Sequence, residues 1–290
     1  MRSFSRCLRC AVLGLGFLLL SVQLSPAQQP PSPSGARTLL LPRKLVTGEH
    51  ATLAVLDLNG RLTPGVNIVF SDGETVATDA TGRALFAAPL NAGIIYANID
   101  GHAARVSSAI LTPADVPSAT EEVTAAPRAA SINDRFELAG HGFCGDADTN
   151  HVDIAGSPGL ALASSPASLV VLPPPDMEPG PAQVKLTCGQ KSAQPFIIVF
   201  VALELEASNA SLAPGERRAL NVHVRGSTAK LHIEAHNLSP NVAELAGGPI
   251  VRGISSGGAD NVAKFELLGK TRGNFAISIR LITPLSAPRF

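Results

Sequence analysis

Residues 51–86, ATLAVLDLNGRLTPGVNIVFSDGETVATDATGRALF, decide the fold class of this chain. Apolar side chains recur here at every second position, with Val66, Ile68 and Phe70 on one face, and a period of two indicates β-strands rather than helices. The turn sequences DLNG at 57–60 and DATG at 79–82 separate the apolar runs. Short strands broken by turns at this spacing are typical of an antiparallel β-sandwich.

The same pattern continues along the chain, and no window shows a helical period of 3.6 residues. Prolines and small polar residues at 113–119 form a linker, whereas the apolar run 196–201 continues into Leu203-Glu-Leu-Glu206 with no spacer. We therefore predict an all-β protein of three tandem antiparallel β-sandwich domains, the second and third of which are joined rigidly. The predicted domains are 38–112, 120–201 and 202–290.

Residues 1–27 have the features of a signal peptide. Three arginines precede an apolar run at 11–22, and Ser25 and Ala27 supply small residues at positions −3 and −1 of a cleavage site. Residues 28–37 follow as a Pro/Ser linker without a hydrophobic period. The mature chain is therefore expected to be exported, to an extracellular, cell-surface or periplasmic location.

Cleavage after residue 27 leaves Cys144 and Cys188 as the cysteines of the mature chain. Two cysteines in an exported protein most often form one disulfide, and the alternative is a pair of free buried thiols. A bridge closing a loop of about 45 residues is worth roughly 4 kcal/mol by loop entropy. We predict the disulfide.

Composition excludes several function classes. The mature chain has 20 basic and 23 acidic residues, a balance that argues against a polybasic nucleic-acid binder. Trp is absent and Tyr occurs once, so a stacking platform for bases or sugars is not expected. No second apolar run reaches 18 residues, so no transmembrane segment is predicted in the mature chain.

The first segment resembles known bacterial modules. Asp57-Leu-Asn-Gly60, Pro64-Gly-Val66 and Thr78-Asp-Ala-Thr-Gly-Arg-Ala84-Leu-Phe86 are similar to the turn and hairpin motifs of bacterial Ig-like domains and of carboxypeptidase-regulatory-like domains. This resemblance implies an Ig-like sandwich with a structural or spacer role and no catalysis.

The second segment resembles the IPT/TIG domain, an Ig-like sandwich of surface proteins. The matching stretches are 136–143 (FELAGHGF), 150–156 (NHVDIAG), 164–173 (SSPASLVVLP) and 180–186 (GPAQVKL). Val184, Leu186 and Cys188 share one face, so Cys188 is expected to point inward. The third segment matches no family with confidence, and a third Ig-like sandwich is the simplest prediction.

One interpretation of the histidines on the third segment is a metal site. If strands 219–225 and 230–236 paired as a hairpin, His223 would lie opposite His232 and beside Glu234. Two imidazoles and a carboxylate suit Zn²⁺ or Cu²⁺. The alternative is an ordinary solvated strand face.

One interpretation of Asp146, Asp148, Asn150 and Asp153 is a calcium site. Their spacing imitates the first half of an EF-hand loop, but His151 stands where that loop needs Gly and Ser157 where it needs Glu. The alternative is an acidic turn.

These patterns predict a non-enzymatic protein without a cofactor: a cell-envelope scaffold, adhesion or assembly module that contacts a protein or an envelope polymer, and not nucleic acid, through edge strands and loop tips. Two alternatives stay open at this point. One is a metal- or small-ligand-binding module on the histidine-bearing strands, and the other is an accessory subunit of a secreted enzyme.

Overall fold

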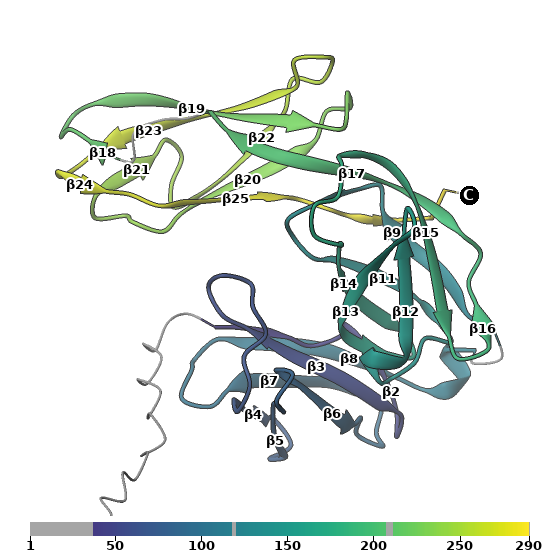
Figure 1. The fold of residues 1–290 in the computed structure, drawn as a ribbon. Coiled ribbons are helices and arrows are strands. Elements are labelled where there is room, and N and C mark those ends of the chain that lie inside the picture. The colour runs from purple at the N-terminus through teal and green to yellow at the C-terminus, as the bar shows by residue number, and fades with distance from the viewer. Residues whose placement is uncertain (1–36, 118–119, 207–210, 290) are drawn as a thin grey trace, which may run out of the picture. The chain divides into compact units, whose positions relative to one another are not determined.

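The computed structural model confirms the all-β prediction (Figure 1). It describes residues 37–117, 120–206 and 211–289. The predicted signal peptide 1–27 lies outside the described residues, as does the predicted linker 28–37 except for its last residue. Within the described part of the chain, the only helical elements are two short 3₁₀ turns, η1 (Pro113–Asp115) and η2 (Ala147–Thr149).

The first sandwich has a five-stranded and a three-stranded layer. The larger layer runs in the order β2 (Lys44–Val46), β8 (Arg105–Leu111), β7 (Gly93–Ile99), β4 (Asn67–Phe70) and β5 (Thr75–Ala77). The other joins β1 (Thr38–Leu40), β3 (His50–Leu56) and β6 (Arg83–Ala87). Only the β2–β8 pair is parallel among these pairings. Val66, Ile68 and Phe70 are buried in the core between the layers, as their shared face predicted.

The second sandwich repeats this arrangement. One layer contains β9 (Glu122–Pro127), β11 (Phe136–His141), β14 (Ser168–Leu172) and β13 (Ser157–Ser165). The other contains β10 (Ala129–Ser131), β17 (Phe196–Leu205), β15 (Gly180–Cys188) and β12 (Asn150–Ile154), with the short β16 (Lys191–Ser192) against β15. Strand β13 pairs with β12 through residues 157–159 and with β14 through residues 160–165, and a bulge between Ala161 and Ala163 interrupts the second pairing.

The third sandwich begins on the same strand that ends the second. Residues 202–205 of β17 pair with β19 (Arg217–Arg225), which is followed by β23 (Val262–Gly269) and β21 (Ala243–Leu245). The facing layer joins β22 (Ile250–Ile254), β20 (His232–Asn237) and β25 (Ile277–Leu281). The small pair β18 (Ser211–Leu212) and β24 (Gly273–Asn274) completes it. The predicted lack of a spacer thus corresponds to one continuous strand, β17.

The last strand returns to the second sandwich. β26 (Leu285–Ser286) pairs with β9, and Arg289 forms a further bridge with Ile197. The second and third sandwiches are therefore linked twice, by β17 and by the chain that follows β25.

The predicted hairpin between 219–225 and 230–236 is wrong. β19 pairs with β17 and β23, whereas β20 pairs with β22 and β25, so the two strands lie in different layers. The connection between them crosses the sandwich, and the Asn261 side-chain amide holds it by donating to the carbonyl oxygens of Ser227 (2.9 Å) and Ala229 (2.8 Å). Alternation of apolar residues identifies strands but not their partners.

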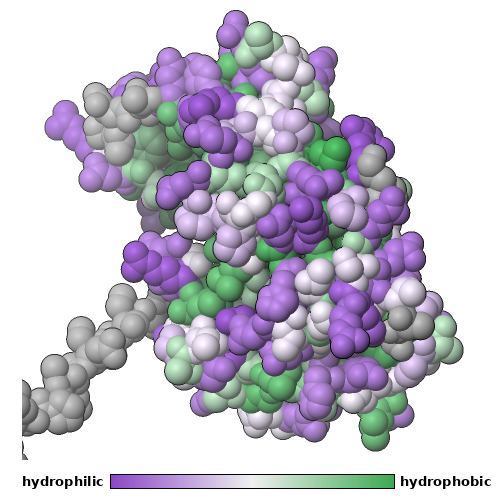
Figure 2. All heavy atoms as spheres, turned by 45° about the vertical axis from the view of Figure 1, so that its right-hand side comes forward, coloured by the Kyte–Doolittle hydropathy of each residue, from purple (hydrophilic) through white to green (hydrophobic). Residues whose placement is uncertain are grey.

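The surface is mixed. Figure 2 shows hydrophilic side chains spread over the visible face, with hydrophobic ones in small groups between them.

Candidate functional site

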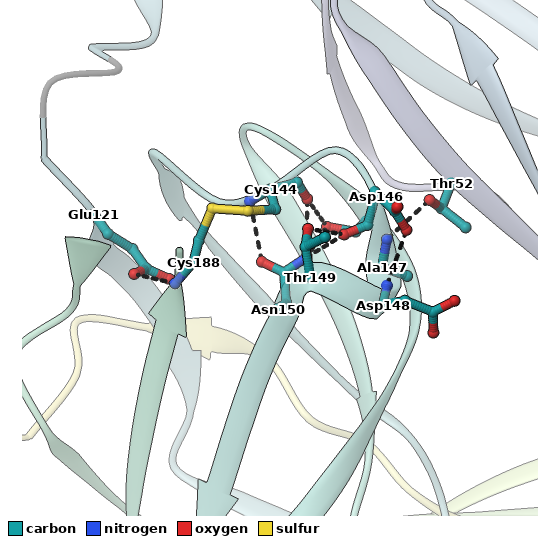
Figure 3. The surroundings of a disulfide bond; sticks show 10 residues. Thr52, Glu121, Cys144, Asp146, Ala147, Asp148, Thr149, Asn150 and Cys188 are labelled. Carbon is teal, nitrogen blue, oxygen red and sulfur yellow. Dashed lines mark hydrogen bonds between the residues drawn. A yellow bond between two sulfur atoms is a disulfide. The ribbon is translucent and has the colours of Figure 1, made fainter. Parts of the chain in front are cut away.

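A disulfide between Cys144 and Cys188 anchors the loop that precedes β12 (Figure 3). The two Cα atoms are 5.6 Å apart, and the bridge ties this loop to the end of β15. The Asn150 side chain closes the loop, because its Oδ1 accepts from the Cys144 backbone N–H (3.0 Å) and its Nδ2 donates to the Cys144 carbonyl (2.9 Å). The predicted disulfide is present.

The anchored loop lies against β3 of the first sandwich. The Thr52 hydroxyl donates to the Gly145 carbonyl oxygen (2.8 Å) and accepts from the Ala147 N–H (3.0 Å). Beside it, Thr52 pairs with Ser164 of β13 in the ladder. Gly145 is required by space, since a Cβ there would lie 2.0 Å from the His50 carbonyl oxygen. We use the name anchored junction for the contacts that loop 144–149 makes with β3 and with the neighbouring β6 of the first sandwich.

Arg83 adds a charged contact to the anchored junction. Its Nη2 lies 2.7 Å from Asp148 Oδ1, and its Nη1 donates to the Ala161 carbonyl (3.0 Å). Arg83 is buried, at 8% exposed. Removing Asp148 would therefore leave a buried positive charge without its ion-pair partner, which is destabilising. No local sequence signal marks this pair, because Arg83 stands in a turn-and-hairpin sequence and its partner Asp148 is far away in the chain.

Glu121 lies next to the disulfide. Its Oε2 accepts from the Cys188 N–H (3.1 Å), while its buried Oε1 has no hydrogen-bond partner within the described structure. Burial raises the pKa of Glu121 to about 7, against the opposing effects of the Cys188 N–H and the Lys191 charge. Glu121 therefore changes its charge near neutral pH. Its carboxylate lies at the end of β15 that the disulfide ties to the loop.

The residues of the predicted calcium site serve the loop and its neighbours. Asp146 caps η2 by accepting from the Asp148 N–H (3.0 Å), and Asp148 pairs with Arg83. Asn150 closes the Cys144 loop, and Asp153 accepts from the Gly156 N–H (3.1 Å). The structure does not gather these side chains around a common point.

The residues of the predicted histidine site are separated. His223 on β19 lies opposite Glu204 and Val262, whereas His232 lies on β20 in the other layer. Glu234 instead accepts from Arg252 Nε at 3.0 Å. The expected His223–His232 juxtaposition is wrong for the same reason as the hairpin. In the described part of the chain, no group of three or more His, Cys, Asp or Glu side chains is placed to hold a metal ion.

Among the residues that the structure describes, no helix is long and apolar enough to cross a bilayer.

Comparisons with known proteins identify no family. No family model matches the sequence, and no curated protein matches it significantly. Among solved structures, the chain is similar to the Bacteroides ovatus mixed-linkage glucan utilization locus protein SGBP-B in complex with a mixed-linkage heptasaccharide (TM-score 0.30, 11% identity, 82% of this chain and 73% of that one).

Two further structures are similar at the same level. They are the surface layer protein SbsC, domains 1–6 (TM-score 0.19, 15% identity, 89% of this chain and 40% of that one), and the ICAM-5 D1–D4 ectodomain fragment (TM-score 0.19, 14% identity, 88% and 76%). With TM-scores of 0.30 or less, these similarities carry no conclusion about function.

Proposed function

We propose that this protein is an exported, non-enzymatic scaffold in which tandem Ig-like sandwiches hold binding surfaces at a fixed spacing in the cell envelope or outside the cell. The observation that carries this proposal is the anchored junction. A disulfide-held loop lies against the backbone of the preceding sandwich, with a hydroxyl that both donates and accepts across the contact. Beside this contact, Leu40, Ala54 and Leu56 of the first sandwich share an apolar cluster with Leu162, Ala163 and Val170 of the second. Apolar packing between neighbouring domains restricts their independent movement.

The predicted family memberships belong to the same proposal. In the first and second sandwiches, a short strand pairs in parallel with the last strand, as β2 does with β8 and β10 with β17. This strand order supports an Ig-like module at 38–112, of the bacterial Ig-like or carboxypeptidase-regulatory-like type, and an IPT/TIG-like module at 120–201. The partner of such a scaffold would be a protein or an envelope polymer.

Calorimetry tests the anchored junction. We expect the first and second sandwiches of the wild type to unfold in one transition. Thr52→Val removes the hydroxyl and leaves the Ala147 N–H without its acceptor, so it should destabilise the pair by about 1–2 kcal/mol and separate their transitions.

Thr124→Val is the matched control, because Thr124 donates to Ala139 within the second sandwich alone. Separate transitions in the wild type, unchanged by Thr52→Val, would contradict the scaffold role.

Export is tested with the full chain expressed in a bacterium. We expect a mature N-terminus at Gln28, a fraction outside the cytoplasm, and a mass two hydrogens below that of the reduced chain. Retention of residues 1–27 on a cytoplasmic product would contradict this part of the proposal.

A further inference from the structure

In the third sandwich one strand is paired on one side, where the corresponding strands of the first two sandwiches are paired on both sides. In the first, β7 lies between β4 and β8, and in the second, β15 lies between β12 and β17. In the third, β25 pairs with β20 and lies at the edge of its layer within the described residues. The strand that would cover it leaves instead, since β26 pairs with β9 (Figure 1).

The free backbone groups of β25 can be assigned from its hydrogen-bonding phase. The Ile282 N–H donates to the His232 carbonyl (2.9 Å), and the Leu238 N–H donates to the Ala276 carbonyl (3.0 Å). In an antiparallel pair, alternate residues direct their peptide groups toward the partner. The N–H and C=O groups of Ile277, Ile279 and Leu281 therefore point away from β20. No second strand pairs with them among the described residues, and β10 of the second sandwich lies near β25 without pairing with it.

The core-facing side chains of β25 are more exposed than those of the corresponding strands in the first two sandwiches. Ile277, Ile279 and Leu281 pack against the third core but remain half-buried. At the corresponding strand of the first sandwich, Ile95, Ala97 and Ile99 are at most 4% exposed, and on β15 the inward residues are at most 6% exposed. The difference is what one missing neighbouring strand would produce.

A cavity of about 610 Å³ adjoins this edge. Residues 278–280 of β25 line one side, and Leu203 and Leu205 of β17 line another. Leu205 is 47% exposed, so apolar surface is available beside the free peptide groups. The volume falls in the range of roughly 300–1,000 Å³ that binding pockets occupy.

Among the charged side chains around the cavity, Arg280 is the one that favours an acidic ligand, because Glu234, opposite it in the β20–β25 ladder, pairs with Arg252. Asp57 accepts from the N–H groups of its own turn, and Asp134 pairs with Arg135 at 3.4 Å. Arg280, on the edge strand itself, has no ion-pair partner among the residues that the structure describes. Burial lowers the pKa of Arg135, and the nearby positive charge of Arg280 lowers it further. An incoming carboxylate would relieve this repulsion.

We propose that the edge of β25 binds an extended segment of a partner protein, which adds to the sheet as an antiparallel strand with apolar residues beside Ile277, Ile279 and Leu281 and a carboxylate beside Arg280. Main-chain hydrogen bonds would supply affinity, and the alternating side chains would supply specificity. The paired and free peptide groups of β25 lie in the third sandwich, whereas the anchored junction joins the first two, so Thr52→Val tests one proposal and the β25 variants test the other.

The test uses the mature chain and a capped peptide, Val-Glu-Val-Glu-Val-Glu-Val. We expect saturable binding by calorimetry and slowed amide exchange at Ile277, Ile279 and Leu281. A peptide with Lys in place of Glu should bind at least about tenfold more weakly, and Arg280→Glu should reverse this preference. Arg280 is exposed, so its replacement should leave the fold intact.

A matched pair of proline variants separates binding from folding. Ile279→Pro removes an outward N–H, which an edge strand tolerates, so the variant should keep its circular dichroism spectrum and lose peptide binding. Ser278→Pro removes an N–H that faces β20 and should destabilise the sandwich without any peptide.

Three results would overturn the proposal. One is no binding of either peptide, and another is binding that Arg280→Glu leaves unchanged. The third is protection of Ile277, Ile279 and Leu281 in the free protein together with a dimer in sedimentation, because the occupant would then be a second copy of this chain.

Discussion

The first two sandwiches and the third are built from the same alternating strands but differ in how their sheets end. β7 and β15 each have a strand on both sides, and their inward residues are buried. β25 pairs with one strand, β20, because the chain that follows it pairs with the second sandwich. The alternation of apolar and polar residues thus determines which side chains face a core, whereas the path of the chain determines whether that core is fully covered.

The largest change in stability is expected from the disulfide, which lies in the second sandwich, where the strand corresponding to β25 is paired on both sides. Replacing Cys144 and Cys188 together with Ser should lower the free energy of unfolding of the second sandwich by about 4 kcal/mol, through loop entropy in the unfolded chain. Urea denaturation measures this change. Amide hydrogen exchange at Ile277, Ile279 and Leu281 should stay as in the wild type. A loss of stability confined to the third sandwich would contradict the assignment of the disulfide to the second.

The next effect concerns the anchored junction. Gly145→Ala places a methyl group where the His50 carbonyl oxygen lies 2.0 Å away, so we expect a loss of about 1–3 kcal/mol. Gly253→Ala is the control, because its added Cβ would meet the Phe265 ring at 3.2 Å and no backbone atom closer. Equal stability of the two variants in urea would show that loop 144–149 does not lie against β3.

A pH dependence should accompany Glu121. Its folded-state pKa of about 7 lies above the ordinary value of 4.5, so its contribution to stability is complete below about pH 4.5 and is lost as pH rises through 7. Glu121→Gln cannot ionise, so its free energy of unfolding should rise relative to that of the wild type by about 1–2 kcal/mol between pH 5 and pH 8. This is less than the whole pKa shift would give, because solvent screens part of the charge. Parallel pH profiles of the two proteins in urea denaturation would refute the assignment.

The smallest effect compares equivalent strands directly. Ile95→Val on β7 removes a methylene from a fully covered core and should cost about 1 kcal/mol. Ile279→Val on β25 should cost about half as much or less, because Ile279 is half-buried. Equal losses in urea denaturation would mean that the third core is covered as well as the first.

Much of the fold was predictable from the sequence because burial follows alternation. Val66, Ile68 and Phe70 are buried together, and the pairing of Cys144 with Cys188 followed from their number in the mature chain. The partner of each strand was not predictable: β19 and β20 are adjacent in the chain but lie in different layers.

The candidate sites were harder to predict than the fold. Arg83 and Asp148 meet across two sandwiches, so no local spacing marks them. The open edge of β25 depends on β26 pairing elsewhere, and no pattern within 277–281 distinguishes an edge strand from a central one.

Amide hydrogen exchange of the free protein tests the central claim most directly. If β25 lacks a neighbour, Ile277, Ile279 and Leu281 should exchange fast while Ser278, Arg280 and Ile282 exchange slowly, and all residues of 95–99 on β7 should exchange slowly. Uniform slow exchange along 277–282 in the monomer would contradict the account, because every peptide group of β25 would then be paired.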